Sequence, residues 1–546
     1  MTQNVAEVAG SVLADLGVGH AFGVVGSGNF HVTNALRAGG VAFTAARHEG
    51  GAASMADGYS RLAGRPGVLT VHQGCGLTNA MTGITEAAKS RTPMIVLAAD
   101  TAGAAVNSNF RINQDLLATS VGAVAERVHG PASAVADITR AFTTAVHGRR
   151  TVVVSLPLDV QAAPLDAALP LAGVAAPDPA RPAASAVAGL AGLLAAAERP
   201  VFVAGRGGRS AGPEIAALAR RAGALLTTSA VANGLFAGDE FDLGISGGFA
   251  TPLAAELIAG ADLIVGWGCA LNMWTMRHGT LIGPAAQVVQ VDDDLAALGA
   301  HQPVDLGVLG DCAATAADTL DALGAGTPTR AGYRTAEVSK RLSGRRWWNE
   351  VPTDDLGTAD RIDPREFSKA LDRALPAERL VSVDSGNFMG YPSAYLRVPD
   401  EFGFCFTQAF QSVGLGLASG IGAALAQPGR LPVIATGDGG FLMGVAELET
   451  AVRLGRPMVV AVYDDAAYGA EVHHFTGADH GAVTFPDRDL AAIGRGFGAT
   501  GVTVRTRDDL TAVAQWARDP AGVLVIDAKI ASDGGSWWLA EAFKGH

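Results

Sequence analysis

The chain has 546 residues, of which 49% are hydrophobic and 17% charged, so it holds enough apolar material for three or four domains, each with its own core. Its formal net charge of −13 excludes nucleic acid as an expected partner, because a surface that binds phosphates is usually basic. Four widely spaced cysteines without a CxxC pair exclude a disulfide framework and a zinc site, and they favour a reducing cytoplasm.

The apolar runs of the sequence indicate no membrane anchor or export signal. Residues 1–16 contain neither a basic segment nor a long apolar run. Mean hydropathy is high at +0.25, but the most apolar window, residues 183–197, is too short and too rich in Gly and Ala to span a bilayer. We therefore predict a soluble cytoplasmic protein with no membrane partner.

Short runs of Val, Ile and Leu alternate with Ala-rich stretches along the chain, which is typical of βα repeats with parallel sheets. Two changes of composition divide it. Residues 175–182 are rich in proline and predict a linker, and residues 326–363 end in Asp363-Pro364, a typical helix start. We predict an α/β protein with three doubly wound parallel-sheet domains at residues 1–172, 184–326 and 360–546.

In the first predicted domain, polar side chains follow apolar runs. Glu49 precedes a stretch of small residues, His72 follows residues 67–71, and Ser27 and His31 follow an earlier run. A glutamate at such a place is usually a solvated charge at a helix start, and a single histidine is usually structural. Gln114 lies in a segment that is equally well explained as a solvated loop. The residues alone leave these roles open.

The middle predicted domain contains a Gly-rich turn, residues 205–208, after an apolar run that ends at Ala204. A turn of this kind raises the question of a nucleotide such as FAD or ADP. One Gly-rich turn is weak support for a nucleotide site, because glycine also serves tight turns that bind nothing. We therefore do not expect FAD.

The third predicted domain contains a strand–turn–helix–strand pattern. An apolar strand over residues 431–435 runs into a Gly-rich turn with Asp438, and a helix is expected over residues 442–454. A second strand over residues 458–463 then leads to Asp465. Glycines let the backbone approach a diphosphate, and two carboxylates can hold a divalent ion against its oxygens. Oxygen ligands with places left for phosphate and water favour Mg²⁺.

Titratable and aromatic residues follow this pattern. Glu471 and His473 lie just beyond the second strand, on an expected helix that could face a substrate. Near the C-terminus, the segment Asp533-Gly534-Gly535-Ser536-Trp537-Trp538 places two large rings after a pair of glycines. We expect this segment to be a buried anchor or an oligomer contact, and a hinged lid is the alternative.

The first and third predicted domains match each other at one constant offset without a gap. Residues 47–50 align with residues 411–414, Gly58 with Gly422, and residues 71–76 with residues 435–440. The turn of the third domain carries Asp438 at the position where the first has Gly74. We interpret this as two copies of one fold, of which only the second keeps the acidic turn.

These motifs together resemble enzymes that use thiamine diphosphate (ThDP), in the group of acetolactate synthase, benzoylformate decarboxylase and pyruvate decarboxylase. The similar segments are the Arg-His-Glu block at residues 47–49, residues 67–79, the strand at residues 151–160, residues 261–268 and 288–292, and Gly437-Asp438-Gly439 with its partner turn. The resemblance spans nearly the whole chain. It implies a pyrimidine-binding, a middle and a diphosphate-binding domain, in that order.

The resemblance also implies roles for individual residues. Glu49 would hydrogen-bond the pyrimidine ring, and Val413 would support the bent cofactor. His72, Glu471 and His473 would be catalytic. Mg²⁺ would be held by Asp438, Asp465 and the carbonyl of Ala467, and substrate would be contacted by Ser27, His31 and Gln114. The remaining cofactor-binding residues would be Gly386, Asn387, Phe388, Gly437, Gly439, Gly440, Tyr468 and Gly469.

The sequence departs from the family pattern at three places. Cys75 replaces the usual proline, Val413 replaces a larger Met, Leu or Ile, and Asp464 and Asp465 stand where asparagine is common. A second carboxylate next to the metal strengthens the attraction for Mg²⁺ and adds negative charge near the diphosphate. We therefore expect ThDP binding to depend strongly on the metal.

The activity implied by the resemblance is cleavage or formation of a C–C bond next to a carbonyl. Decarboxylation of a 2-keto acid, with or without transfer of the acyl group to an aldehyde or second keto acid, is the simplest form. The alternatives are an acetolactate synthase-like carboligase, an FAD-assisted 2-keto acid oxidase and a non-catalytic ThDP-binding subunit. By analogy, we expect a homodimer or homotetramer with shared active sites. The motifs do not identify the donor or the acceptor.

Overall fold

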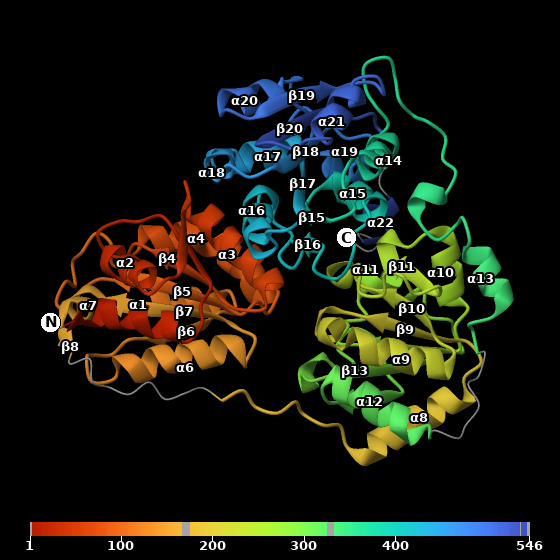
Figure 1. The fold of residues 1–546 in the computed structure, drawn as a ribbon, viewed down its shortest axis with the longest axis horizontal. Helices are drawn as coiled ribbons and strands as arrows, with labels where there is room; N and C mark the ends of the chain where they lie inside the picture. The colour runs from red at the N-terminus through yellow and green to blue at the C-terminus, as the bar shows by residue number, and fades with distance from the viewer. Residues whose placement is uncertain (1–2, 166–174, 325–331, 535–536, 543–546) are drawn as a thin grey trace.

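Three parallel six-stranded sheets build the molecule, each covered by helices (Figure 1). The computed structural model describes residues 3–165, 175–324, 332–534 and 537–542. The predicted domain ends at residues 172 and 326, the outermost residues of the first and last domains, and Gly535-Ser536 lie outside these ranges. The predicted α/β fold with three doubly wound domains is confirmed.

The first domain has the strand order β3-β2-β4-β5-β7-β6, with every neighbouring pair parallel. The strands β4 and β5 are buried throughout, as expected for a sheet covered on both faces. A short antiparallel pair, β1 and β8, closes the domain. The strands are β1 (Gln3–Asn4), β2 (His20–Gly23), β3 (Ala42–Ala45), β4 (Gly67–Val71), β5 (Met94–Asp100), β6 (Val124–Arg127), β7 (Thr151–Pro157) and β8 (Pro164–Leu165). The helices are α1 (Val5–Asp15), α2 (Phe30–Ala38), α3 (Glu49–Ala63), α4 (Cys75–Lys89), α5 (Gln114–Ser120), α6 (Ala134–Val146) and α7 (Leu158–Ala162).

The middle domain has a different strand order, β11-β10-β9-β12-β13-β14. Its strands are β9 (Pro200–Ala204), β10 (Leu225–Thr228), β11 (Asp242–Ile245), β12 (Leu263–Trp267), β13 (Gln287–Asp292) and β14 (Leu306–Leu309). Its helices are α8 (Ala184–Ala196), α9 (Gly212–Ala222), α10 (Pro252–Ala259), α11 (Met273–Met276) and α12 (Cys312–Ala322), and α13 (Ala336–Leu342) follows them. The predicted linker at residues 175–182 contains neither helix nor strand.

The third domain has the order β16-β15-β17-β18-β20-β19, which repeats the topology of the first sheet strand for strand. Its strands are β15 (Arg379–Val383), β16 (Phe404–Phe406), β17 (Leu431–Gly437), β18 (Met458–Asp464), β19 (Thr500–Val504) and β20 (Val523–Lys529). Its helices are α14 (Pro364–Ala374), α15 (Gly390–Tyr395), α16 (Gly416–Ala426), α17 (Asp438–Gly444), α18 (Glu447–Arg453), α19 (Gly469–His474), α20 (Leu490–Gly496), α21 (Leu510–Trp516) and α22 (Trp537–Ala542). The internal repeat read from the sequence therefore agrees with the two sheets.

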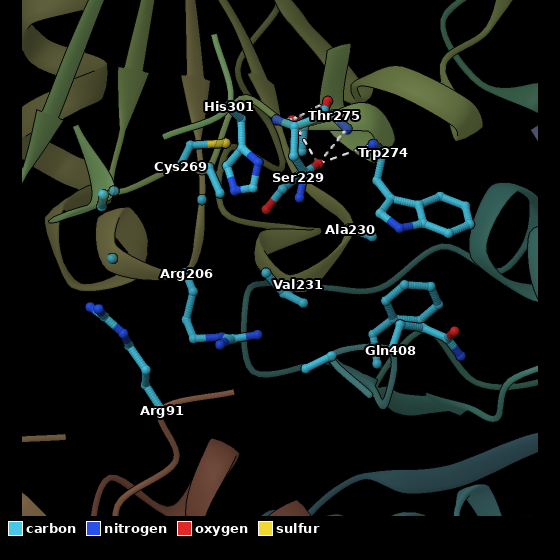
Figure 2. Close-up of a pocket in the computed structure, with 18 of the residues that line it drawn as sticks. Arg91, Arg206, Ser229, Ala230, Val231, Cys269, Trp274, Thr275, His301 and Gln408 are labelled. Carbon is cyan, nitrogen blue, oxygen red and sulfur yellow. Dashed lines mark hydrogen bonds between the residues drawn. The ribbon is translucent and has the colours of Figure 1, made fainter. Parts of the chain in front are cut away.

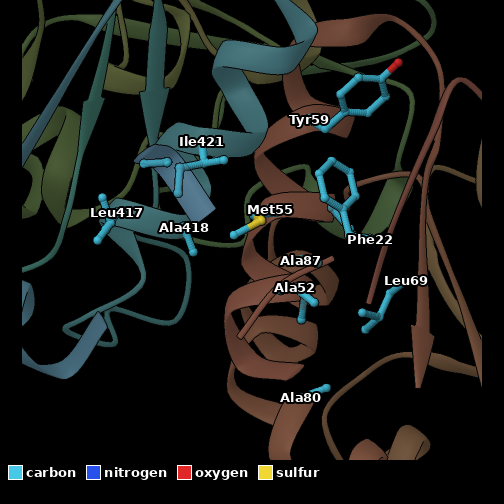
Figure 3. Close-up of a cluster of buried hydrophobic side chains, with 14 of the residues drawn as sticks. Phe22, Ala52, Met55, Tyr59, Leu69, Ala80, Ala87, Leu417, Ala418 and Ile421 are labelled. Atoms are coloured by element: carbon cyan, nitrogen blue, oxygen red, sulfur yellow. The ribbon is translucent and has the colours of Figure 1, made fainter. Parts of the chain in front are cut away.

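Helices α3 and α16, which correspond in the two copies, pack against each other across the domain boundary (Figure 3). A Cβ at Gly58 would overlap the carbonyl of Ser419, and a Cβ at Gly422 would overlap the carbonyl of Met55. Glycine is required at both positions because backbone lies directly against backbone. The aligned glycines of the repeat are thus the contact points between its copies.

One predicted helix is wrong in its bounds. We expected a single helix over residues 442–454, but α17 already begins at Asp438 and a second helix, α18, begins at Glu447. Between them the bonds are of the tighter i→i−3 type, from Leu448 N to Val445 O and from Glu449 N to Ala446 O. The helix starts early because strand β17 extends to Gly437, whose extended backbone serves as the N-cap.

None of the helices in the described ranges combines the length and the hydropathy that crossing a membrane requires. The apolar window at residues 183–197, which is the most hydrophobic in the sequence, forms α8 of 13 residues on the middle sheet. Its buried side chains pack in the core of that domain.

Candidate active site

The acidic turn lies at the C-terminal end of β17, where the strand passes directly into α17. A Cβ at Gly439 would lie 2.7 Å from the ring of Tyr468, and one at Gly437 would lie 3.3 Å from the ring of Phe388. These glycines therefore allow the turn to approach two aromatic rings that come from other segments. The turn is close-packed beneath and is bounded by residues that the sequence had singled out separately.

Two carboxylates and an amide converge at this turn. A Cβ at Gly469 would overlap Asp465 Oδ2 and lie 3.0 Å from Asn387 Nδ2. Burial raises the pKa of Asp438 to about 8, and the charge of Asp465 acts in the same direction. Burial likewise raises the pKa of Asp465 to about 7. A dry group of oxygen donors whose charges repel one another is suited to a divalent cation, so these residues fit Mg²⁺.

Asp464 and Asp465 are neighbours in sequence but face different surroundings. Asp464, the last residue of β18, accepts a hydrogen bond from Lys529 Nζ at 2.5 Å inside the protein. Lys529 also pairs with Asp527 at 3.0 Å and Asp487 at 2.7 Å. Asp465 instead turns toward the acidic turn, and its Oδ1 accepts from Ala467 N at 3.3 Å. Only Asp465 of this pair lies with Asp438.

Val413 lies beside the same turn, on the segment between β16 and α16. Its side chain is 37% exposed, and Cγ1 lies 3.4 Å from where a Cβ of Gly440 would stand. The next residue is held by Asp384, whose two oxygens accept from Gly414 N at 3.2 and 3.1 Å. Burial raises the pKa of Asp384 to about 6. The structure thus brings Val413, the acidic turn and the loop at residues 386–388 together.

Glu49 belongs to a second cluster, in the first domain. It is the first residue of α3, it is half-buried, and its Oε2 accepts from Asn79 Nδ2 at 3.0 Å. Its Oε1 lies near Gly76, at the start of α4. These described contacts are all with its own domain. Within one chain, Glu49 and the acidic turn are therefore parts of separate clusters.

The predicted substrate residues of the first domain are partly brought together. His72 Nε2 lies 3.4 Å from Ser27 Oγ, and its ring meets that of Phe110 edge-on at 5.0 Å. His31 is exposed on α2, where its ring contacts Phe30. Gln114 is buried, with Oε1 accepting from Gly74 N at 3.1 Å. His72 and Ser27 form a pair, whereas the amide of Gln114 is engaged inside the domain.

The two titratable residues after the acidic turn lie on α19. Glu471 is exposed in the first turn of this helix, and His473 is half-buried in the last turn. The helix follows Tyr468 directly, and Glu471 N donates to Tyr468 O at 3.1 Å. Both side chains are therefore carried by an element fixed to the acidic turn.

Sequence reasoning missed three residues that hold these clusters. Asn79 fixes Glu49, Asp384 fixes the segment with Val413, and Glu447 of α18 bonds to the backbone next to Glu49. Asn79 stood within a quoted motif and Asp384 stood just before a predicted phosphate loop, so position in sequence offered a signal for both. Glu447 offered none, because its partner belongs to another domain.

The largest cavity, of about 730 Å³, lies where the three domains meet (Figure 2). The predicted Gly-rich turn of the middle domain lines it with Gly205, Arg206 and Gly207, and the far side carries Trp274 and Phe249. Arg206 donates to the carbonyl of Ser90 in the first domain. The cavity is separate from the acidic turn, and whether a nucleotide binds in it is not tested by this geometry.

The anchor at the C-terminus is buried. Trp538 has no exposed surface, and its Nε1 donates to Asn387 O at 3.0 Å. Trp537 Nε1 donates to Gly248 O of the middle domain at 2.8 Å. The two rings therefore join the predicted phosphate loop to the middle domain, as expected for an anchor.

Comparison with known protein families accounts for each of the three domains. Residues 3–117 match the N-terminal TPP-binding domain of thiamine pyrophosphate enzymes, residues 187–323 match their central domain, and residues 384–528 match their C-terminal TPP-binding domain. Thiamine pyrophosphate is another name for ThDP. The three matches occur in the order that the resemblance implied.

Several enzymes are similar along nearly the whole chain. A probable 2-ketoarginine decarboxylase of Pseudomonas aeruginosa is 30% identical over 95% of this chain and 92% of its own. A sulfoacetaldehyde acetyltransferase of Rhodobacter capsulatus is 31% identical over 92% and 89%, and an acetolactate synthase of Bacillus subtilis is 28% identical over 96% and 93%. The chain belongs to the family of thiamine pyrophosphate enzymes.

Proposed function

We propose that the protein is a ThDP- and Mg²⁺-dependent enzyme that decarboxylates a 2-keto acid, with or without transfer of the acyl group to an aldehyde or second keto acid. The observation that carries this proposal is the convergence of Asp438, Asp465 and Asn387 around glycines that leave no room for a side chain. Relatives named as decarboxylase, acetyltransferase and acetolactate synthase support the reaction class.

The third domain would hold the charged end of the cofactor. Mg²⁺ would be bound by Asp438, Asp465 and the carbonyl of Ala467, and the diphosphate by the backbone of the two Gly-rich loops. Val413 would support the cofactor between its rings, since it is exposed directly beside Gly440. The further contacts proposed are Gly386, Asn387, Phe388, Gly437, Gly439, Tyr468 and Gly469.

The first domain would supply the activating carboxylate. ThDP, when bound, provides the nucleophilic carbon and the electron sink for decarboxylation. Glu49 would hold a proton between Oε1 and the pyrimidine ring, while Asn79 fixes Oε2. Proton transfers to the reacting carbonyl would fall to His72, which lies beside Ser27, and to Glu471 and His473 on α19. His31 and Gln114 would border the substrate.

The complete site would form between subunits of a homodimer or homotetramer. The described contacts of Glu49 are with its own domain, and Val413 is exposed beside the acidic turn, which supports a site that a second chain completes. Cys75, Cys269, Cys312 and Cys405 are all free thiols, which supports a reducing cytoplasm as the location.

Titration with ThDP at fixed Mg²⁺, followed by intrinsic fluorescence, tests this proposal. Asp465→Ala should weaken the apparent affinity roughly tenfold or more, because it removes one of the two carboxylates next to the metal. Asp479→Ala, an exposed carboxylate in the next loop, should leave the affinity unchanged. Equal affinities for wild type and Asp465→Ala would contradict the metal assignment.

Product analysis separates the alternatives. Incubation with a panel of 2-keto acids and aldehydes should give CO₂ and an aldehyde for a decarboxylase, and a hydroxyketone for an acetolactate synthase-like carboligase. We do not expect a flavin, so purified protein should be colourless, whereas yellow protein would favour an FAD-assisted oxidase. A non-catalytic subunit would bind ThDP without accelerating exchange of its C2 proton.

A further inference from the structure

A carboxylate of the third domain reaches across to the residues just before Glu49. Glu447, the first residue of α18, is 3% exposed. Its Oε1 accepts from His48 N at 2.9 Å and from Arg47 N at 3.1 Å. Its Oε2 accepts from Thr450 Oγ1 at 2.7 Å, which fixes the carboxylate from behind.

This contact takes the place of a missing helix cap. In a capping box, the side chain at the third helical position accepts from the backbone N–H of the N-cap residue. The N-cap of α3 is His48, and the third helical position is Gly51, which has no side chain. A Cβ at Gly51 would overlap the carboxylate of Glu447. Glu447 therefore occupies the position that a capping carboxylate of α3 itself would fill.

The cap acts on the residue that the proposed function uses. Glu49 is the first helical residue, directly after His48, so the direction in which α3 begins decides where its carboxylate points. Two backbone N–H groups bound to one buried carboxylate fix that direction. The same short pair of helices, α17 and α18, begins at Asp438 and ends with the residues around Glu447.

We infer that Glu447 is a positioning residue that sets the orientation of Glu49 and so controls activation of the cofactor without touching it. This inference rests on the proposed function. It assigns to α17–α18 a second task, because the element that would hold the metal at one end fixes the activating carboxylate of the same chain at the other.

The test compares Glu447→Gln with Glu449→Gln. The first substitution keeps the size of the side chain but removes the charge and one acceptor. Glu449 lies on the same helix and pairs with the exposed side chain of Arg47, so its variant is a matched control. Exchange of the ThDP C2 proton, measured by quenched-flow NMR in holoprotein, should fall roughly tenfold or more in Glu447→Gln and stay within about twofold of wild type in Glu449→Gln. The affinity for ThDP and Mg²⁺ should stay within about threefold in both.

A second pair of variants tests the geometry. Glu447→Ala should slow the exchange at least as much as Glu447→Gln. The double variant Gly51→Glu/Glu447→Ala places a capping carboxylate on α3 itself and should recover part of the exchange rate. The space is available, because the three nearest atoms to a Cβ at Gly51 all belong to Glu447.

The outcomes are distinguishable. Wild type that neither binds ThDP nor exchanges its proton would refute the proposed function itself. Normal exchange in Glu447→Gln would overturn only the positioning role. A loss of ThDP affinity as large as the loss of exchange would also overturn it, because Glu447 would then be a general contact between domains.

Discussion

Adjacent residues in this chain perform unlike tasks because the end of a strand turns one side chain inward and the next toward the site. Asp464 and Asp465 show this, since only the first reaches Lys529. Lys529 is 1% exposed and balances Asp464 and Asp527. A buried charge is tolerated only when it is paired, so the residues behind the acidic turn depend on this ammonium group.

Lys529→Met should therefore destabilise the fold by roughly 3–5 kcal/mol, the usual cost of leaving a buried charge without its partner. Urea unfolding followed by circular dichroism measures the loss. Lys340→Met, which removes an exposed lysine of α13, should change the stability by less than about 0.5 kcal/mol. Equal midpoints for the two variants would show that the cluster around Lys529 contributes nothing.

A buried histidine predicts how stability depends on pH. Burial lowers the pKa of His20 from 6.5 to about 4, and the ring is bonded to Thr44 Oγ1 at 2.8 Å. Unfolded chains take up this proton near pH 6.5 and the folded protein does not, so stability is lost as pH falls from 6.5 toward 4. By pH 5 the loss from this group is about 2 kcal/mol. His20→Gln should reduce the difference in unfolding free energy between pH 7 and pH 5 by that amount.

At the scale of elements, the sequence predicted best where one strand end carries both the pattern and the chemistry. The strands around Asp438 and Asp465 are where the apolar runs placed them, because buried parallel strands are continuous hydrophobic segments. The helix after Asp438 was misplaced, since Gly437 continues the strand and the chain tightens at Val445. The contact of Glu447 with His48 was out of reach, because no local pattern encodes which domains meet.

Helix α22 supports the predicted phosphate loop from below. Trp538 fills a fully buried place beneath Asn387 and lies against Gly390, where a Cβ would overlap its ring. Trp538→Ala should cost about 3–5 kcal/mol and weaken ThDP binding, because the loop loses both packing and the bond to its carbonyl. Trp516→Ala on α21, whose ring donates to Ala521 O, is the control for loss of a tryptophan. Unchanged ThDP affinity in Trp538→Ala would show that the loop holds its shape alone.

At the scale of the molecule, the two copies of the repeated fold meet through α3 and α16 and leave their functional ends apart. The glycines at the crossing bring the helices together, while Glu49 and Val413 each stand beside groups of their own domain (Figure 3). A single chain therefore carries both halves of a site without joining them. Two chains related by a two-fold axis would complete two sites at once.

Mixing two inactive variants tests this arrangement directly. Glu49→Gln disables the first-domain half and Asp438→Asn the third-domain half, so each protein alone should show almost no exchange of the ThDP C2 proton. After the subunits are mixed and reassorted, half of the dimers contain one variant of each kind, and one of their two sites combines Glu49 of one chain with Asp438 of the other. Exchange should then recover to roughly a quarter of the wild-type rate. A mixture that stays inactive after verified reassortment would place both halves of each site in the same chain.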